Sequence, residues 1–171
     1  AVSIPPAMKV DVGKLDFSIP VFGKQIRVIE IVPDQVITTE RIESIDTTAS
    51  VIGADCDRDL LKIAVIERHQ NSGNIGKGFI KGLGLKKGAL ASSVAHDSHN
   101  IIVVGTNDAD MLQAVQEIAA MGGGLIVIKD QQIIEQLPLP IAGLMSREPL
   151  QNVKNKLDSI IKAAQNQGVV L

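Results

Sequence analysis

The sequence predicts an α+β fold in which mixed or antiparallel strands pack in layers with two main helices. Runs of aliphatic and β-branched residues of strand length fill much of residues 24–104. Helical spacing of apolar residues begins only after residue 107. Because a run of strands followed by late helices favours α+β, a doubly wound parallel sheet is disfavoured.

The bulk properties indicate one globular domain and argue against several classes of function. The chain has 171 residues, 45% of them apolar, which is enough for a sizeable core. A net charge of -2 and only three aromatic residues argue against nucleic-acid binding. Apolar runs such as residues 101–104 are too short to span a membrane. A single cysteine, Cys56, excludes a disulfide framework and fits a cytoplasmic location.

The first third of the chain predicts a lead-in followed by strands. Residues 1–23 contain Pro5, Pro6 and Pro20 without a sustained apolar period, which predicts an extended lead-in or linker. The domain proper is then expected at 24–171. Strand patterns, with a turn at Pro33 and Asp34 between the first two, cover residues 26–32, 36–45 and 60–67.

Six of the fifteen glycines lie in residues 73–88, and five of these stand at even positions. If extended, the segment would present a bare glycine face that another backbone or a ligand can approach closely. The nucleotide-binding patterns GxGxxG and GxxxxGK[ST] are both absent, so close packing is the preferred interpretation. The four lysines of this segment likewise fit a solvated strand face better than a phosphate site. Further strands are expected at 89–95 and 101–104.

Two helices with recognisable ends follow. Asn107 is placed to cap the first, and the glycines at 122–124 end it. The second begins after Ser146 and stops at Gly168. Between the two helices, a hairpin is predicted from residues 125–128 and 133–137.

The densest polar cluster, SSVAHDSHN at residues 92–100, lies between two predicted strands and holds two of the three histidines. Rigid scaffolds often carry function on such loops, and an imidazole beside a carboxylate suits proton transfer or ligand orientation. A plain polar turn, in which Asp, Ser and Asn bond their own backbone, is favoured equally by the residues alone. The candidate functional residues are Ser93, His96, Asp97, Ser98, His99 and Asn100.

The same cluster makes a poor metal site or nucleophilic triad. His96, Asp97 and His99 offer at most three ligands from one short turn, and nothing elsewhere obviously completes them. The zinc deaminase signature needs at least two cysteines. A Ser–His–Asp triad is disfavoured because no Gly-x-Ser-x-Gly elbow is present. We therefore expect this chain to bind no metal by itself.

Four segments closely resemble stretches of the adenine deaminases, which belong to the amidohydrolase superfamily, and they occur in that family's order. They are IRVIEIVPDQVITTE from Ile26, LLKIAVIERHQNSGNIGKGFIKGLGLKKGALASS from Leu60, ASSVAHDSHNIIVVGTN from Ala91, and LPLPIAGLMS from Leu137. Together they cover most of residues 24–150. The resemblance implies the C-terminal domain of a hydrolase of purine salvage or catabolism, which converts adenine and water to hypoxanthine and ammonia.

The resemblance also implies where the chemistry takes place. The family's barrel holds a manganese or iron pair that activates water, and its ligand set (a His-x-His pair, a carboxylate, further histidines and an aspartate) is not in this chain. The fragment alone is therefore expected to be inactive. Its expected partners are adenine, its own missing N-terminal barrel and further copies in a homo-oligomer, with no nucleic acid or membrane.

The polar loop is then expected to close over adenine at the mouth of the barrel. His96 and Asp97 are assigned an accessory catalytic role. A lid or substrate-binding role is assigned to Ser93, Ser98, His99 and Asn100. Two alternatives stay open: a self-standing small-molecule binding module, and a purely structural or oligomerisation domain.

Overall fold

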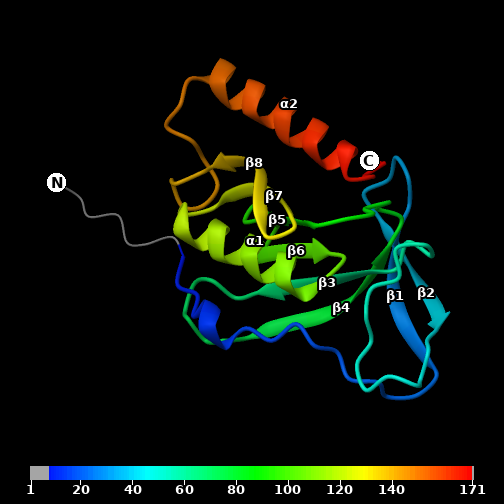
Figure 1. Cartoon of the computed structure of the whole chain (residues 1–171). Helices are drawn as coiled ribbons and strands as arrows, with labels where there is room; N and C mark the ends of the chain where they lie inside the picture. Colours follow the sequence, from blue (N-terminus) through cyan, green and yellow to red (C-terminus); the bar gives the residue numbers. More distant parts are fainter. Residues whose placement is uncertain (1–7, 171) are drawn as a thin grey trace.

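A computed structural model describes residues 8–170 and shows an eight-stranded sheet between two helices (Figure 1). Neither helix of this described part has the length and apolar character needed to cross a membrane. The elements, in chain order, are η1 (Val12–Lys14), β1 (Gln25–Ile31), β2 (Thr38–Ser44), β3 (Leu61–Ile66), β4 (Ile75–Lys81), β5 (Ala89–Ser92), β6 (Ile101–Gly105), α1 (Asp108–Ala120), β7 (Gly124–Lys129), β8 (Gln132–Pro138) and α2 (Leu150–Asn166).

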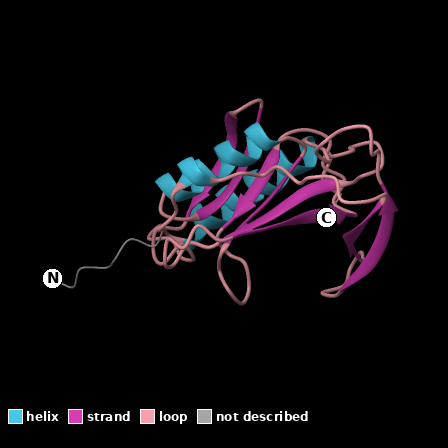
Figure 2. Ribbon diagram, turned by 90° about the horizontal axis from the view of Figure 1, so that it is seen from below, coloured by secondary structure: helices cyan, strands magenta, loops and turns pink. Residues whose placement is uncertain are grey.

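The sheet is mixed and has the strand order β2-β1-β4-β3-β6-β5-β7-β8. Only β1 and β4 run parallel, and every other neighbouring pair in the described chain is antiparallel. The β1–β2 hairpin curls away from the rest of the sheet (Figure 2). The predicted α+β fold with two late helices is confirmed.

The face covered by α1 holds the larger core. Because side chains alternate along a strand, every second residue of β5 and β6 points at α1, among them Ala91 and Val103, and these are buried. Met111 of α1 is fully buried against them. The helix begins where the sequence predicts, because the Asn107 side chain accepts a hydrogen bond from the backbone N–H of Asp110 at 2.8 Å.

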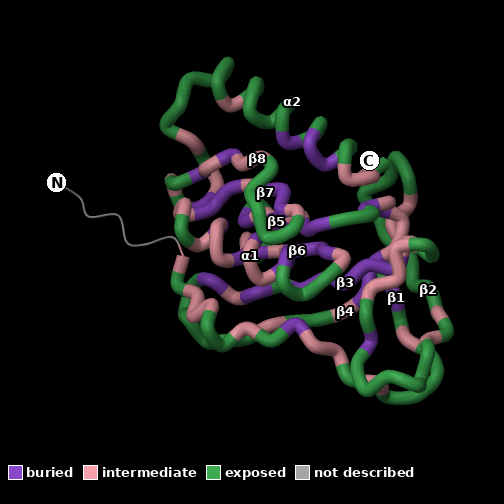
Figure 3. The backbone as a smooth tube through the Cα atoms, viewed as in Figure 1, coloured by how far each residue is buried: buried purple, intermediate pink, exposed green. Residues whose placement is uncertain are grey.

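The opposite face is covered by α2 over β7 and β8 only. Ile160, Ala163 and Ala164 of α2 pack on Val127 and Leu137. The rest of the helix surface is largely exposed (Figure 3). Further along this face, the turn after β4 and the end of the chain bury a second apolar cluster. The middle of the face, between these two regions, is therefore only partly covered.

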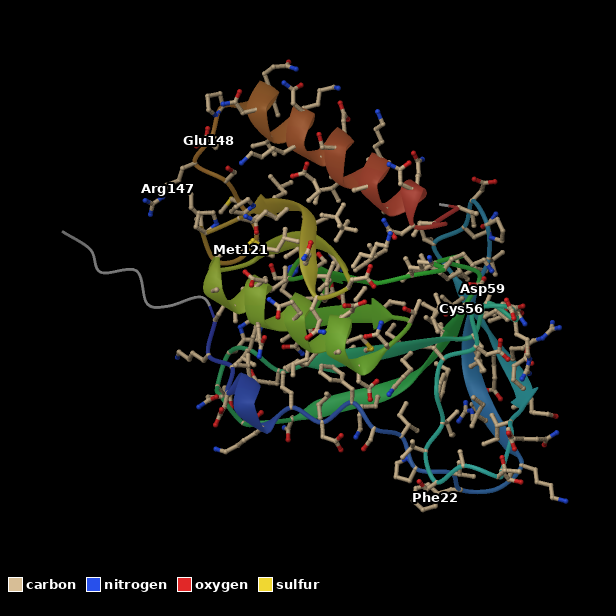
Figure 4. All side chains as sticks on the ribbon, viewed as in Figure 1. Phe22, Cys56, Asp59, Met121, Arg147 and Glu148 are labelled. Atoms are coloured by element: carbon tan, nitrogen blue, oxygen red, sulfur yellow. The ribbon has the colours of Figure 1, made fainter. Side chains whose placement is uncertain are left out.

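The turn after β4 is held by a carboxylate. Asp59 accepts hydrogen bonds from the backbone N–H groups of Gly82 and Gly84, both at 2.8 Å. Gly84 has φ +82°, and a Cβ there would lie 2.6 Å from the carbonyl oxygen of Gly168. A side chain at this position would therefore separate the turn from the end of α2. Asp59 and Cys56 lie close together beside this turn (Figure 4).

Two predicted strands are shorter in the structure than expected. Within the glycine-rich run only β4 is extended, so the bare face is limited to Gly76 and Gly78; the later glycines adopt positive φ and turn the chain. The strand expected over 89–95 stops at Ser92 because the N–H of Val94 donates to Ser92 Oγ at 2.9 Å. The N–H of Val94 is thus bonded to a side chain of its own segment and not to a neighbouring strand.

The segment expected as an extended lead-in or linker is described from residue 8 onward. Residues 8–23 lie along the sheet and include the short helix η1. Phe17 is 4% exposed and packs into the core on the α1 side. Ile52 donates its N–H to the carbonyl of Ile19 at 2.8 Å, which joins this segment to the loop before β3.

Candidate functional site

Three loops meet at one end of the sheet. The β3–β4 loop (67–74) and the β5–β6 loop (93–100) leave this end, and the segment 139–146 after β8 lies beside them. The first described residues arrive at the same place, because the N–H of Lys9 donates to the carbonyl of Arg68 at 2.9 Å. All three histidines of the chain belong to the first two loops.

Ser93 fixes the base of the β5–β6 loop and is fully buried. Its hydroxyl donates to the carbonyl of Gly143 at 2.6 Å and accepts from the N–H of Gly124 at 2.8 Å. These contacts join β5, β7 and the segment 139–146. The hydroxyl is thus engaged by the protein, and the predicted contact of Ser93 with substrate stays a prediction.

Arg68 joins the β5–β6 loop to the segment 139–146 through its buried guanidinium. The side chain is 2% exposed, and its Nε donates to the carbonyl of His99 while Nη2 donates to the carbonyl of Ala142 at 3.0 Å. Burial lowers the pKa of Arg68 from its ordinary value, because desolvation disfavours the cation. The guanidinium nevertheless stays charged in proteins, so these are charge-assisted hydrogen bonds.

The outer arc of the loop, His96 to Ser98, faces solvent. The Nδ1 atom of His96 lies in hydrogen-bond contact with the Asp97 carboxylate, and the two side chains are 85% and 86% exposed. Since Nδ1 faces the carboxylate, a ligand approaching this pair would meet Nε2. An exposed imidazole–carboxylate pair on a buried, hydrogen-bonded base therefore faces outward at this end of the domain.

His99 and Asn100 form the inner arm of the loop. His99 has φ +48° and donates its N–H to the carbonyl of Ala95 at 2.6 Å. Its ring stands edge-on to that of His96, with ring centroids 6.0 Å apart. Within residues 8–170, Nδ1 of His99 and Oδ1 of Asn100 are buried and have no hydrogen-bond partner. Because such atoms are costly to leave unpaired, groups supplied from outside this part of the chain would stabilise them.

The β3–β4 loop supports the histidine loop and was not singled out by the sequence. The Glu67 carboxylate accepts from the N–H groups of Ser72 and Gln70 at 3.1 and 2.8 Å, and also from that of His69. These hydrogen bonds lower the pKa of Glu67 to about 2, and the bond from the N–H of Ser72 has the largest effect. His69 Nε2 in turn donates to the carbonyl of Ser98 at 3.0 Å. The signal that could have drawn attention to it is a Glu-Arg-His run directly after an apolar strand.

The described residues do not fit a metal pair. No three His, Cys, Asp or Glu side chains between residues 8 and 170 converge into a metal site. At the histidine end, Asp97 faces His96, whereas His69 is bonded to the carbonyl of Ser98. Asp97 and His69 are therefore directed at protein groups and not at a common centre.

The sequence matches known proteins over most of its length. Residues 35–171 match the family described as "Adenine deaminase C-terminal domain". The adenine deaminase of Desulfatibacillum aliphaticivorans is 49% identical over 162 residues, which are 95% of this chain and 28% of that protein. That of Dehalococcoides mccartyi is 49% identical over 156 residues, 91% of this chain and 27% of that protein.

A third relative, adenine deaminase 2 of Carboxydothermus hydrogenoformans, is 44% identical over 151 residues, 88% of this chain and 26% of that protein. The chain therefore spans about a quarter of the length of the curated relatives it matches.

Proposed function

Because this chain belongs to the family of adenine deaminase C-terminal domains, we propose that it works as the last domain of a longer adenine deaminase. The complete protein would hydrolyse adenine to hypoxanthine and ammonia in the cytoplasm, as part of purine salvage or catabolism. The chemistry would take place in the preceding polypeptide. A manganese or iron pair would be held there, since residues 8–170 offer no site that fits one.

The role of this domain is to close the active site with the outer arc of the β5–β6 loop. The observation that carries this proposal is an exposed His96–Asp97 pair mounted on a buried base of Ser93 and Arg68. A polar group that is exposed at the edge of its own domain, on a hydrogen-bonded base, is suited to meet a ligand bound elsewhere. Closing over adenine would exclude water, which strengthens the electrostatic interactions around the purine.

Two further features support this orientation. Lys9, near the start of the described chain, is bonded to Arg68, so the preceding polypeptide would join the domain beside the loop. The buried unpaired atoms of His99 and Asn100 lie in the same loop. Donors or acceptors from the preceding domain would satisfy them once the loop is closed.

The test is a kinetic comparison in the complete enzyme. His96→Asn and Asp97→Asn should each lower kcat/KM for adenine roughly 10- to 100-fold, the loss expected for one hydrogen bond involving a charged group of about 1.5–3 kcal/mol. Asp158→Asn is the matched control, because that aspartate is 57% exposed on α2. Kinetics unchanged in both loop variants would refute the lid and leave a structural or separate binding role.

A further inference from the structure

The uncovered part of the α2 side of the sheet is an ordered apolar row. Strand pairing places Gly76 beside Val65, Val65 beside Ile102, Ile102 beside Ser92, and Ser92 beside Leu125. All five side-chain positions face the α2 side, because their strand neighbours pack on the α1 side. Val65 remains 36% exposed, and no residue of this outer row carries a charge.

Beside the outer row the sheet and α2 form a groove of about 230 Å³. Its floor includes Ile102, Ser92 and Leu125, and its wall is Ile160 and Ala164. Helical spacing continues this wall in a stripe with Leu157 and Ile161, which are 38% and 45% exposed. Two aliphatic surfaces, one from the helix and one from the sheet, thus face a common apolar hollow. A continuous apolar surface of this kind marks an interaction site.

The groove does not suit adenine itself. Ser92 is the polar side chain of the outer row, and its hydroxyl is engaged with Val94, whose N–H it accepts at 2.9 Å. A polar heterocycle there would leave its ring nitrogens and amino group without partners. A protein surface with aliphatic side chains has no such cost.

We propose that the outer row and the groove are where the preceding domain of the same polypeptide docks. This inference rests on the proposed function, in which that domain exists. About three quarters of the length of the relatives lies outside the region matched by this chain. The outer row also passes through Ser92, the last residue of β5, directly before the Ser93–Asn100 loop, so a domain seated on it would lie near His96 and Asp97.

The position of the chain entry agrees with this occupant. Arg68, whose carbonyl accepts from the N–H of Lys9, lies two residues after the end of β3 and three residues after Val65. Lys9 is therefore held at the same end of the sheet as the outer row, with Met8 and Val10 packed on the α1 side of that end. A docked domain would cover the row and place the loop over its own active site. One interface accounts for the apolar face and for the exposed polar loop.

Hydroxyl-radical footprinting of the complete enzyme, read by mass spectrometry, tests the proposal. Val65 and Leu157 should be oxidised as slowly as Val127, which is fully buried in this domain. Ile133 serves as the reactive reference, because it is 42% exposed and faces the other side of the sheet. Oxidation of Val65 and Leu157 at the rate of Ile133 would overturn the proposal.

A pair of variants identifies the occupant. In the complete enzyme, Val65→Glu should raise the oxidation rate of Leu157, while the molar mass in sedimentation stays that of the wild type. Ile133→Glu should change neither the oxidation rate of Leu157 nor the molar mass. A fall in molar mass with Val65→Glu would instead assign the face to a second copy and overturn the proposal. If Val65→Glu does not fold, Leu157→Glu gives the same comparison, with the oxidation rate of Val65 as the readout.

These readouts are independent of turnover. A protected outer row together with unaltered kinetics of His96→Asn would refute the lid and keep the docking face. A reactive outer row together with impaired His96→Asn would do the reverse.

Discussion

Ser93→Ala removes a single oxygen atom from the interior and keeps the methylene carbon that packs beside it. The hydroxyl donates to Gly143 at 2.6 Å and accepts from Gly124 at 2.8 Å. The variant therefore leaves one carbonyl and one N–H buried without these partners. Each unsatisfied group costs about 1–3 kcal/mol, so the free energy of unfolding should fall by about 2–6 kcal/mol. For a chain of this size a loss of 3 kcal/mol corresponds to a Tm roughly 6–12 °C lower.

The assay is urea unfolding of the 171-residue chain followed by circular dichroism, with a thermal scan beside it. The midpoint should shift to lower urea at an unchanged slope, because the folded and unfolded surfaces are nearly the same. Ser98→Ala is the control, since that hydroxyl is exposed and only accepts from Asn100 at 3.5 Å. Its effect should stay within about 0.5 kcal/mol. An equally small loss for Ser93→Ala would refute the idea that this residue braces the loop.

Two further predictions concern pH and thiol reactivity. The pKa of Glu67 is depressed from 4.5 to about 2, so the carboxylate contributes stability that is complete above pH 4.5 and is lost as the pH falls toward 2. Glu67→Gln should remove that part of the acid destabilisation in urea titrations, whereas identical pH profiles would contradict it. Burial raises the pKa of the Cys56 thiol, so iodoacetamide should alkylate it more slowly than a free cysteine at neutral pH and faster in urea. Equal rates in both conditions would contradict this prediction.

Much of the fold could be predicted because its signals are local. The Asn107 cap lies three residues from its partner, and a short continuous run of aliphatic residues marks β6 without knowledge of its neighbours. The parallel pairing of β1 with β4 carries no such signal, because it depends on how the later strands arrange themselves. The stop of β5 at Ser92 was also missed, since a serine hydroxyl competing for a backbone N–H looks the same in sequence as a strand residue.

The candidate site was predicted in part, and the residue positions explain why. The polar density of residues 92–100 identified the loop. The hydrogen bonds that support the loop could not be predicted, because Ser93 meets Gly143 across 50 residues of chain and Arg68 meets Ala142 across 74. Such pairings arise only when β5, β7 and the segment after β8 come together. The sequence therefore showed where the polar groups are, and the structure showed which of them are buried supports and which are exposed.

A crystal structure of the complete enzyme with adenine bound would test the central claim most directly. We predict that the outer arc of the loop lies over the purine, with His96 or Asp97 at hydrogen-bond distance, about 3 Å, from a ring nitrogen or the amino group. A structure in which this pair faces bulk solvent while adenine is bound and enclosed by other residues would contradict it.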